Sequence, residues 1–333
     1  MSDTTMMRAV WSVPGENGGR VELRDVPLPH PGPGQVRVRV RASAINRGEL
    51  LALSALKTGS GAIGGVECAG EIDAIGPSVT GWQVGDAVMA HGRGAQAQFA
   101  CFDQRALMKK PPRLDWSQAA AFPNVFVTAH DALITHGNVR AGESVLINAA
   151  SSGIGMAAIQ IARWAGARSI IASSRSSDKI ERLRPLGLTD AVLADDQGAW
   201  VQQVLELTGG AGVNLIIDSV GASVFEANLR AMAIEGRFVG VGRLGGRDAR
   251  IDLDWLALRR LRLIGVTFRT RSLEQTLECV QACARDLLGP LERGEIQPVV
   301  DSVYELQEIA AAHAHMRSNR QVGKIVLSVE SLR

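Results

Sequence analysis

The sequence predicts an α/β protein in which a β-rich first part is followed by a doubly wound parallel sheet. Before Ser117, short strand patterns are separated by turns, and from Ser117 onward strand and helix patterns alternate. A chain of 333 residues is long enough for two domains that each bury their own core.

The β-rich part is clearest at residues 35–41, where three valines alternate with three arginines. This period of two is typical of a half-buried strand. Shorter strand patterns follow at residues 69–75 and 87–90, with Gly-Pro-Ser and glycine-rich turns between them. Short strands with closely spaced turns predict a small barrel or sandwich.

Six strand patterns, most with helical stretches between them, make up the second part. They cover residues 144–148, 168–173, 191–193, 213–217, 237–241 and 261–266, with the first two helices at 154–165 and 178–186. This alternation predicts a doubly wound, six-stranded parallel sheet. A long helix to about Leu288, a strand at 298–303, a helix at 305–316 and a strand at 324–329 follow, and we expect this segment to return to the first domain.

Composition excludes several classes of protein. The 36 basic and 34 acidic side chains give a net charge of +2, which argues against a nucleic-acid binder. No apolar run approaches the roughly 18 residues that span a bilayer, and no secretory signal is visible. Four scattered cysteines do not form a disulfide scaffold, so we expect a cytoplasmic protein. Cys279 and Cys283 share a helix face, as a buried apolar pair or, less favoured, a metal or redox pair.

A glycine-rich turn, Ala149–Gly155, lies between an apolar strand and an amphipathic helix. Small residues let backbone N–H groups approach a pyrophosphate, and the helix N-terminus adds a positive dipole. The turn therefore predicts a dinucleotide site, the alternative being a tight packing turn without a ligand.

The end of the second strand of the sheet indicates which dinucleotide binds. No acidic residue closes this strand, and Ser174, Arg175 and Lys179 follow. A carboxylate would repel a 2′-phosphate, whereas Arg and hydroxyl groups would hold it. We predict NADP(H), the alternative being that the two cations are a solvated helix start.

Five stretches resemble the medium-chain dehydrogenase/reductase superfamily, and within it the zinc-free quinone oxidoreductase (zeta-crystallin-like) branch. The resemblance covers essentially the whole chain. The stretches are residues 44–49 (AINRGE), 65–70 (GVECAG) with 84–88 (VGDAV), 128–133 (TAHDAL), 145–155 (VLINAASSGIG) and 323–327 (GKIVL).

The resemblance implies a GroES-like β-barrel catalytic domain, residues 1–121 and 271–333, and a Rossmann NADP(H)-binding domain, residues 122–270. It also implies an active site between the domains, lined by Asn46, Thr128 and His130. The implied cofactor-binding residues are Asn46, Thr128, Ser152, Gly153, Ile154, Ser174, Arg175, Lys179, Ser219, Gly240, Val241, Gly242, Arg243, Phe268, Arg269, Thr270 and Asn319.

The sequence departs from its relatives at several points. Ser152 stands where Gly is frequent, His130 replaces a Tyr and Glu49 replaces an Asp. Zinc-dependent members carry a His ligand where this chain has Val66, and the four-cysteine zinc loop is absent. Because Val offers zinc no ligand, we expect no metal.

Without a Lewis acid, hydride transfer favours an acceptor that delocalises its own charge. We therefore expect an NADPH-dependent reductase of a quinone or conjugated enone. Alternatives are an enoyl-thioester or polyketide-tailoring reductase and, in another class, a non-catalytic NADPH-binding sensor or crystallin-like protein. The proton could come from His130, from another group or from water. His91 is a weaker candidate for substrate contact.

The expected partner is a small-molecule substrate, with no nucleic acid and no membrane. The resemblance also implies a homodimer in which edge strands pair, and residues 261–268 are the candidate edge.

Overall fold

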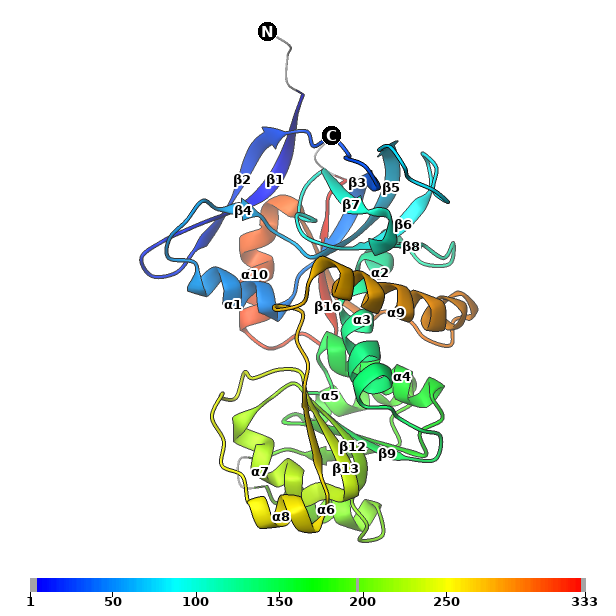
Figure 1. Ribbon diagram of the computed structural model, residues 1–333. Helices are drawn as coiled ribbons and strands as arrows, with labels where there is room; N and C mark the ends of the chain where they lie inside the picture. Colours follow the sequence, from blue (N-terminus) through cyan, green and yellow to red (C-terminus); the bar gives the residue numbers. More distant parts are fainter. Residues whose placement is uncertain (1–4, 196–197, 331–333) are drawn as a thin grey trace. The chain divides into compact units, whose positions relative to one another are not determined.

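The computed structural model describes residues 5–195 and 198–330 (Figure 1). Two compact units divide the chain: unit 1 is Met1–Asn124 with Leu277–Arg333, and unit 2 is Val125–Thr276. The domain boundaries expected from the sequence, at 121/122 and 270/271, remain our proposal for the domains.

Unit 2 contains a six-stranded parallel sheet. Its strand order, β11-β10-β9-β12-β13-β14, is that of a Rossmann fold, as the sequence predicted. The strands are β9 (Ser144–Asn148), β10 (Ser169–Ser174), β11 (Asp190–Leu193), β12 (Val213–Asp218), β13 (Met232–Gly240) and β14 (Arg262–Gly265).

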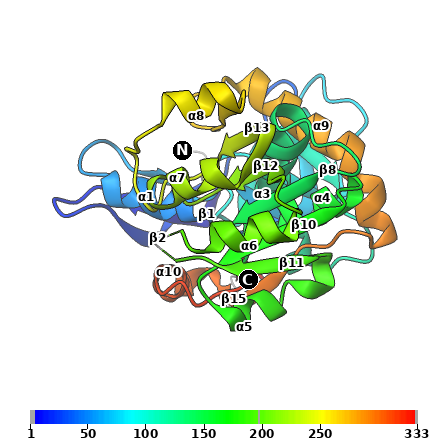
Figure 2. The same ribbon diagram turned by 90° about the horizontal axis from the view of Figure 1, so that it is seen from below.

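Helices cover the two faces of this sheet, and Figure 2 shows α7 and α4 on opposite sides of the strands. The helices are α3 (Pro123–His130), α4 (Gly153–Trp164), α5 (Ser177–Glu181), α6 (Trp200–Leu207), α7 (Ala222–Ala231) and α8 (Leu253–Leu258). Coverage of both faces explains why Val145, Leu146 and Ile147 are all fully buried instead of alternating in exposure.

The described residues of unit 1 form two sheets. One has the order β2-β1-β4 and the other β15-β16-β3-β5-β6-β8, with β7 paired to β3. The strands are β1 (Met6–Val13), β2 (Arg20–Pro27), β3 (Gln35–Ala44), β4 (Ala62–Ile63), β5 (Glu67–Ile75), β6 (Ala87–His91), β7 (Phe99–Asp103), β8 (Leu107–Lys109), β15 (Val300–Glu305) and β16 (Lys324–Ser328).

The α-helices described beside these sheets are α1 (Arg47–Ala55), α2 (Trp116–Ala120), α9 (Leu273–Arg293) and α10 (Ile309–Arg317). The three valines of β3 are buried and Arg39 between them is exposed, which confirms the predicted alternation. The C-terminal strand β16 pairs with β3, so the last segment returns to the β-rich part of the chain.

Two helices end where the sequence did not predict. The expected helix at 178–186 is interrupted after Glu181, because Pro185 has no N–H to continue the ladder and forms a separate turn, Arg184–Leu186. Helix α9 continues past Leu288 and through Pro290 to Arg293, since Leu287, Pro290 and Leu291 are all buried. No helix within the described residues has the length and hydropathy needed to cross a bilayer.

Candidate active site

The turn after β9 has the geometry that a phosphate site requires. Ser152 caps α4, its Oγ accepting a hydrogen bond from the Gly155 N–H at 3.1 Å. A Cβ on Gly155 would lie 2.5 Å from the Ala150 carbonyl oxygen, so only glycine fits there. Ser152, Gly153 and Ile154 are half-buried, so the N-terminus of α4 remains accessible to an anion.

The loops after β12 and β13 lie against each other at the same edge of the sheet. The N–H groups of Val241 and Gly242 donate to the Asp218 carbonyl oxygen at 2.7 and 3.1 Å. A Cβ on Gly242 would lie 2.3 Å from the Ser219 carbonyl oxygen. Gly240 ends β13, so these loops bring predicted cofactor residues together where dinucleotides bind in this fold.

The Asp218 carboxylate fixes the loop after β12 through hydrogen bonds. It accepts from the N–H groups of Val220 and Gly221 at 3.1 and 2.8 Å, and from Asn148 Nδ2 at 3.1 Å. Asn148 also donates to Asn228 Oδ1 at 2.8 Å. Burial raises the pKa of Asp218 to about 6, although its hydrogen bonds act in the opposite direction.

The predicted 2′-phosphate residues lie where β10 ends and α5 begins. Ser174 is buried, Arg175 is exposed and Lys179 is half-buried. The Ser176 N–H donates to Ser174 Oγ at 3.2 Å, which fixes the turn before α5. Arg175 is therefore free to reach an anion from solvent.

Thr128 and His130 are both buried in α3, with exposed fractions of 8% and 2%. The helix continues as a π-helical turn, Asp131–His136. Here Arg271 Nη2 donates to Asp131 Oδ2 at 2.7 Å, and the Arg271 guanidinium stacks on Phe268. The ion pair thus ties the segment after β14, which includes Arg269 and Thr270, to the end of α3.

Asn46 is the centre of a polar network in unit 1. Its Nδ2 donates to Glu49 at 3.0 Å and to Glu67 at 2.8 Å. Its Oδ1 accepts from Lys324 Nζ at 2.6 Å and from Asn124 Nδ2 at 2.8 Å. The amide therefore uses both donor hydrogens and both acceptor sites within the protein.

Glu67 is the buried anion of this network. Lys324 Nζ lies 2.7 Å from Glu67 Oε1, and the Asn124 N–H donates to Glu67 Oε2 at 2.7 Å. His91, which is also buried, lies 3.2 Å from Asn124 Oδ1, and desolvation lowers its pKa. The structure thus joins His91 to the Asn46 network. Asn319, another predicted cofactor residue of unit 1, accepts from Arg47 Nη2 at 2.6 Å.

The residues at the position of the superfamily's catalytic zinc do not fit that metal. Position 46 is an amide, position 66 is Val, and the Glu67 carboxylate is paired with Lys324. Within the part of the chain that the structure describes, no group of three or more His, Cys, Asp or Glu side chains could hold a metal ion.

Sequence reasoning missed several residues of these networks: Asn124, Asp131, Arg271, Lys324 and Gln96, whose Nε2 donates to Glu49 Oε2 at 3.0 Å. Lys324 begins an apolar strand, where a lysine ordinarily marks a solvent-facing position, yet its exposed fraction is 4%. A lysine inside an apolar strand is the one signal that could have indicated a buried acidic partner.

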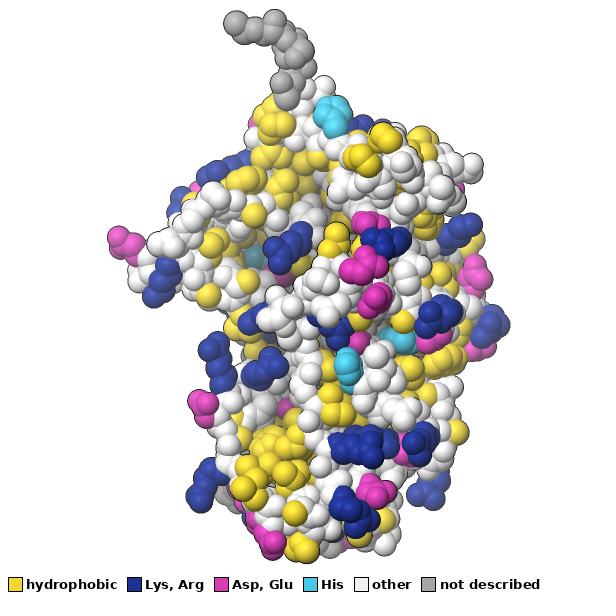
Figure 3. All heavy atoms as spheres, viewed as in Figure 1, with side chains coloured by type: hydrophobic (Ala, Val, Ile, Leu, Met, Phe, Trp, Pro, Cys, Tyr) yellow, Lys and Arg dark blue, Asp and Glu magenta, His cyan; other side chains and the backbone are white. Residues whose placement is uncertain are grey.

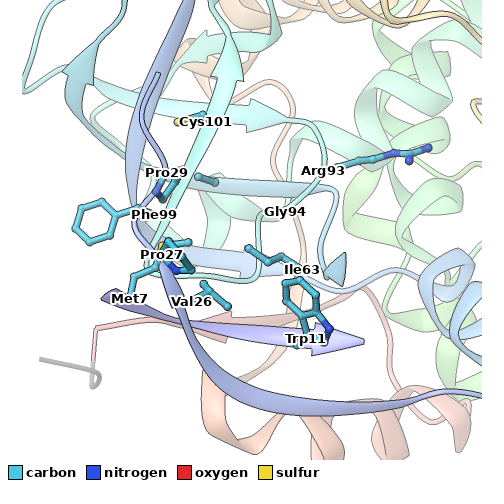
Figure 4. Close-up of a pocket in the computed structure, with 11 residues that line it drawn as sticks. Met7, Trp11, Val26, Pro27, Pro29, Ile63, Arg93, Gly94, Phe99 and Cys101 are labelled. Carbon is cyan, nitrogen blue, oxygen red and sulfur yellow. The ribbon is translucent and has the colours of Figure 1, made fainter. Parts of the chain in front are cut away.

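Unit 1 also has an apolar pocket of about 360 Å³ (Figure 4). Trp11, Ile63 and Phe99 line it, and the Arg93 side chain points away from the other labelled residues. No member of the Asn46 network lines the pocket, so it does not bring together polar groups for catalysis.

Comparisons with known proteins agree with this geometry. Residues 32–112 match the family described as alcohol dehydrogenase GroES-like domain, and residues 153–282 match zinc-binding dehydrogenase. The chain is 35% identical over 270 residues to erythronolide synthase EryA2 of Saccharopolyspora erythraea, which covers 79% of this chain and 7% of that protein. The chain spans at most 18% of the length of such curated relatives.

Solved structures match over nearly the whole chain. An alcohol dehydrogenase superfamily protein from Novosphingobium aromaticivorans is 32% identical with a TM-score of 0.86, over 98% of this chain and 100% of that one. Mycobacterial Rv1454c in complex with NADPH is 25% identical with a TM-score of 0.86, over 97% and 100%. CurK enoyl reductase is 26% identical with a TM-score of 0.82, over 96% and 98%.

The Rossmann sheet, its glycine-bounded turn and the β-rich unit define a dinucleotide-binding oxidoreductase fold. The chain belongs to the medium-chain dehydrogenase/reductase superfamily, and its β-rich part is a GroES-like domain.

Proposed function

We propose that the protein is an NADPH-dependent reductase of a carbon–carbon double bond conjugated to a carbonyl, acting without a metal. The observation that carries this proposal is the turn at the N-terminus of α4, where Gly155 admits no side chain and the exposed Arg175 follows the next strand. When bound, NADPH supplies a hydride to the acceptor. A quinone or an enone can take up this hydride because its carbonyl oxygen delocalises the charge that develops.

The residues of this chain bind and orient the two reactants. We assign the diphosphate to Ser152, Gly153 and Ile154, where a helix N-terminus favours negative charge. We assign the 2′-phosphate to Ser174, Arg175 and Lys179, since a guanidinium holds phosphate through charge-assisted hydrogen bonds. The match to an NADPH complex supports a phosphorylated nicotinamide cofactor.

The remaining assignments follow from the superfamily's motifs. We assign Ser219, Gly240, Val241, Gly242 and Arg243, in the loops after β12 and β13, to the cofactor. We also assign Phe268, Arg269, Thr270 and Asn319 to it. Asn46, Thr128 and His130 are our candidates for the residues nearest the reacting atoms.

An enoyl thioester is the second candidate acceptor. Similarity to polyketide synthases and to CurK enoyl reductase favours it. The same hydride step reduces an enoyl thioester, so the difference lies in how the acceptor is recognised.

Two measurements test the proposal. Steady-state NADPH oxidation with a naphthoquinone, 2-cyclohexenone and crotonyl-coenzyme A ranks the acceptors. Tight NADPH binding without turnover of any of them would favour a non-catalytic NADPH-binding protein.

For cofactor choice, Arg175→Ala is expected to reduce the preference for NADPH over NADH by about 1.5–3 kcal/mol. An unchanged ratio would remove the 2′-phosphate assignment.

We also propose a homodimer. Strand β14 lies at the end of the sheet order, and Leu263 on it is exposed. Figure 3 shows hydrophobic side chains gathered over the region of α7 and α8. The exposed residues Leu253 and Leu258 belong to α8. An apolar surface beside an unpaired strand edge suits a second copy of the same sheet.

A further inference from the structure

Glu49, in the first turn of α1, accepts hydrogen bonds from two neutral amide side chains. Its Oε1 accepts from Asn46 Nδ2 and its Oε2 accepts from Gln96 Nε2, each at 3.0 Å. No ion pair found among the described residues involves Glu49. Glu49 is half-buried.

Glu67 accepts from the same Asn46 amide but has a different environment. It is fully buried, lies 2.7 Å from the Lys324 ammonium and accepts a backbone N–H from Asn124. Two carboxyl groups thus share one amide, and only one has a cation beside it. Acid and base roles separate between carboxyl groups whose environments differ in this way.

The charged groups that face Glu49 are Glu67 on β5 and Lys324 on β16, and Gln96 contributes a neutral amide. Burial has the largest effect and raises the pKa of Glu49 to about 7, while Lys324 and the Asn46 amide oppose this rise. A carboxyl group with such a pKa exchanges protons readily at neutral pH.

We infer that Glu49 is the general acid of the reduction, which rests on the proposed function above. The acceptor gains two electrons and a hydrogen at its β carbon as the hydride supplied by NADPH. The π electrons move towards the carbonyl to form an enolate. The Glu49 O–H bond then breaks and a C–H bond forms at the α carbon. Water returns the proton to the Glu49 carboxylate.

Glu49→Gln tests this inference, because the amide keeps the shape of the carboxyl group but has no acidic proton to transfer. With 2-methyl-2-cyclohexenone as acceptor, we expect kcat to fall at least about 100-fold with the Kd of NADPH unchanged. Glu49→Asp should restore part of kcat. Glu71→Gln, on β5 and paired with Arg41 instead, is the matched control and should leave kcat unchanged.

Reduction in D₂O gives a readout that a structural role would not change. The wild type should place deuterium on one face of the α carbon, whereas Glu49→Gln should give a mixture as water protonates either face. The wild-type kcat should fall as pH rises through about 7, and the variant should lose this dependence.

The protein without cofactor provides an independent check, since carboxyl ¹³C NMR should show one glutamate titrating near pH 7 that is missing in Glu49→Gln. If Glu49→Gln keeps the kcat, the pH profile and the deuterium placement of the wild type, Glu49 is not the general acid. The proposed function would remain intact in that case. Lack of turnover by the wild type with every acceptor would remove the proposed function and this role together.

Discussion

Arg271 Nη2 and Asp131 Oδ2 lie 2.7 Å apart although their residues are 140 positions apart in the chain. The Asp131 side chain has an exposed fraction of 2% and that of Arg271 is 15%, so water screens this pair poorly. His136 Nε2 lies 3.5 Å from the other Asp131 oxygen. The pair fixes the segment after β14, where three predicted cofactor residues lie, onto the end of α3.

Arg271→Met should therefore destabilise the protein by about 3–5 kcal/mol, because a buried carboxylate loses its cation. Urea unfolding measures the loss. Arg230→Met is the control, since Arg230 and Glu226 form an exposed pair on α7 and its loss should cost less than about 1 kcal/mol. Equal decreases in the free energy of unfolding of the two variants would show that the buried Asp131–Arg271 pair stabilises the protein no more than an exposed pair does.

Gly155→Ala should weaken NADPH binding at least about tenfold and destabilise the fold by about 1–3 kcal/mol. The new Cβ would lie 2.5 Å from the Ala150 carbonyl oxygen, so the turn must open. Calorimetric titration and thermal unfolding measure both effects. Gly48→Ala, on α1 with nothing within 4 Å of its Cβ, should keep binding intact and stabilise slightly. Unchanged NADPH affinity in Gly155→Ala would contradict the assignment of the turn.

Asp218 makes stability depend on pH. Its pKa is raised in the folded protein from 3.8 to about 6, so the folded state holds this proton more tightly than the unfolded state does. Its contribution to stability is therefore largest below about pH 4 and falls as pH rises to about 6. The unfolding free energy of the wild type should therefore fall relative to that of Asp218→Asn as pH rises from about 4 to about 6. A difference that stays constant from pH 4 to pH 7 would show that Asp218 does not titrate there.

The proposed dimer predicts that charge on the β14 and α8 surface prevents association. The double substitution Leu258→Glu and Leu263→Glu should halve the mass measured by light scattering. Leu193→Glu, on the opposite edge strand β11 and also exposed, should leave the mass unchanged. A wild type that is monomeric at micromolar concentration would contradict the proposal.

Local patterns of the sequence were sufficient to predict much of the fold. The alternating valines of β3 and the apolar runs of the parallel strands report burial directly, because side-chain direction follows strand period. The ends of helices were harder to predict, because local residue preferences and burial in the folded chain can favour different end points. Pro185 ended a helix, as its chemistry requires, whereas Pro290 did not because its neighbours are buried.

The candidate site was predictable only in part. Residues within a local motif, such as Ser152 and Gly155, could be recognised because one turn holds them. The partners of Asn46 could not, because Lys324 lies 278 positions away, and its place in an apolar strand suggests a buried acidic partner without identifying which residue that is. Arg271 and Asp131 present the same difficulty: charged side chains ordinarily mark solvated surface, and only the folded chain shows that this pair is buried.

The most direct test of the account is NADPH oxidation with 2-cyclohexenone by protein whose zinc content has been measured as zero. We predict stoichiometric conversion of NADPH and enone to NADP⁺ and cyclohexanone, at a rate that added zinc does not raise. Activity that appears only when zinc is restored, or reduction of the carbonyl to an alcohol with the double bond intact, would contradict it.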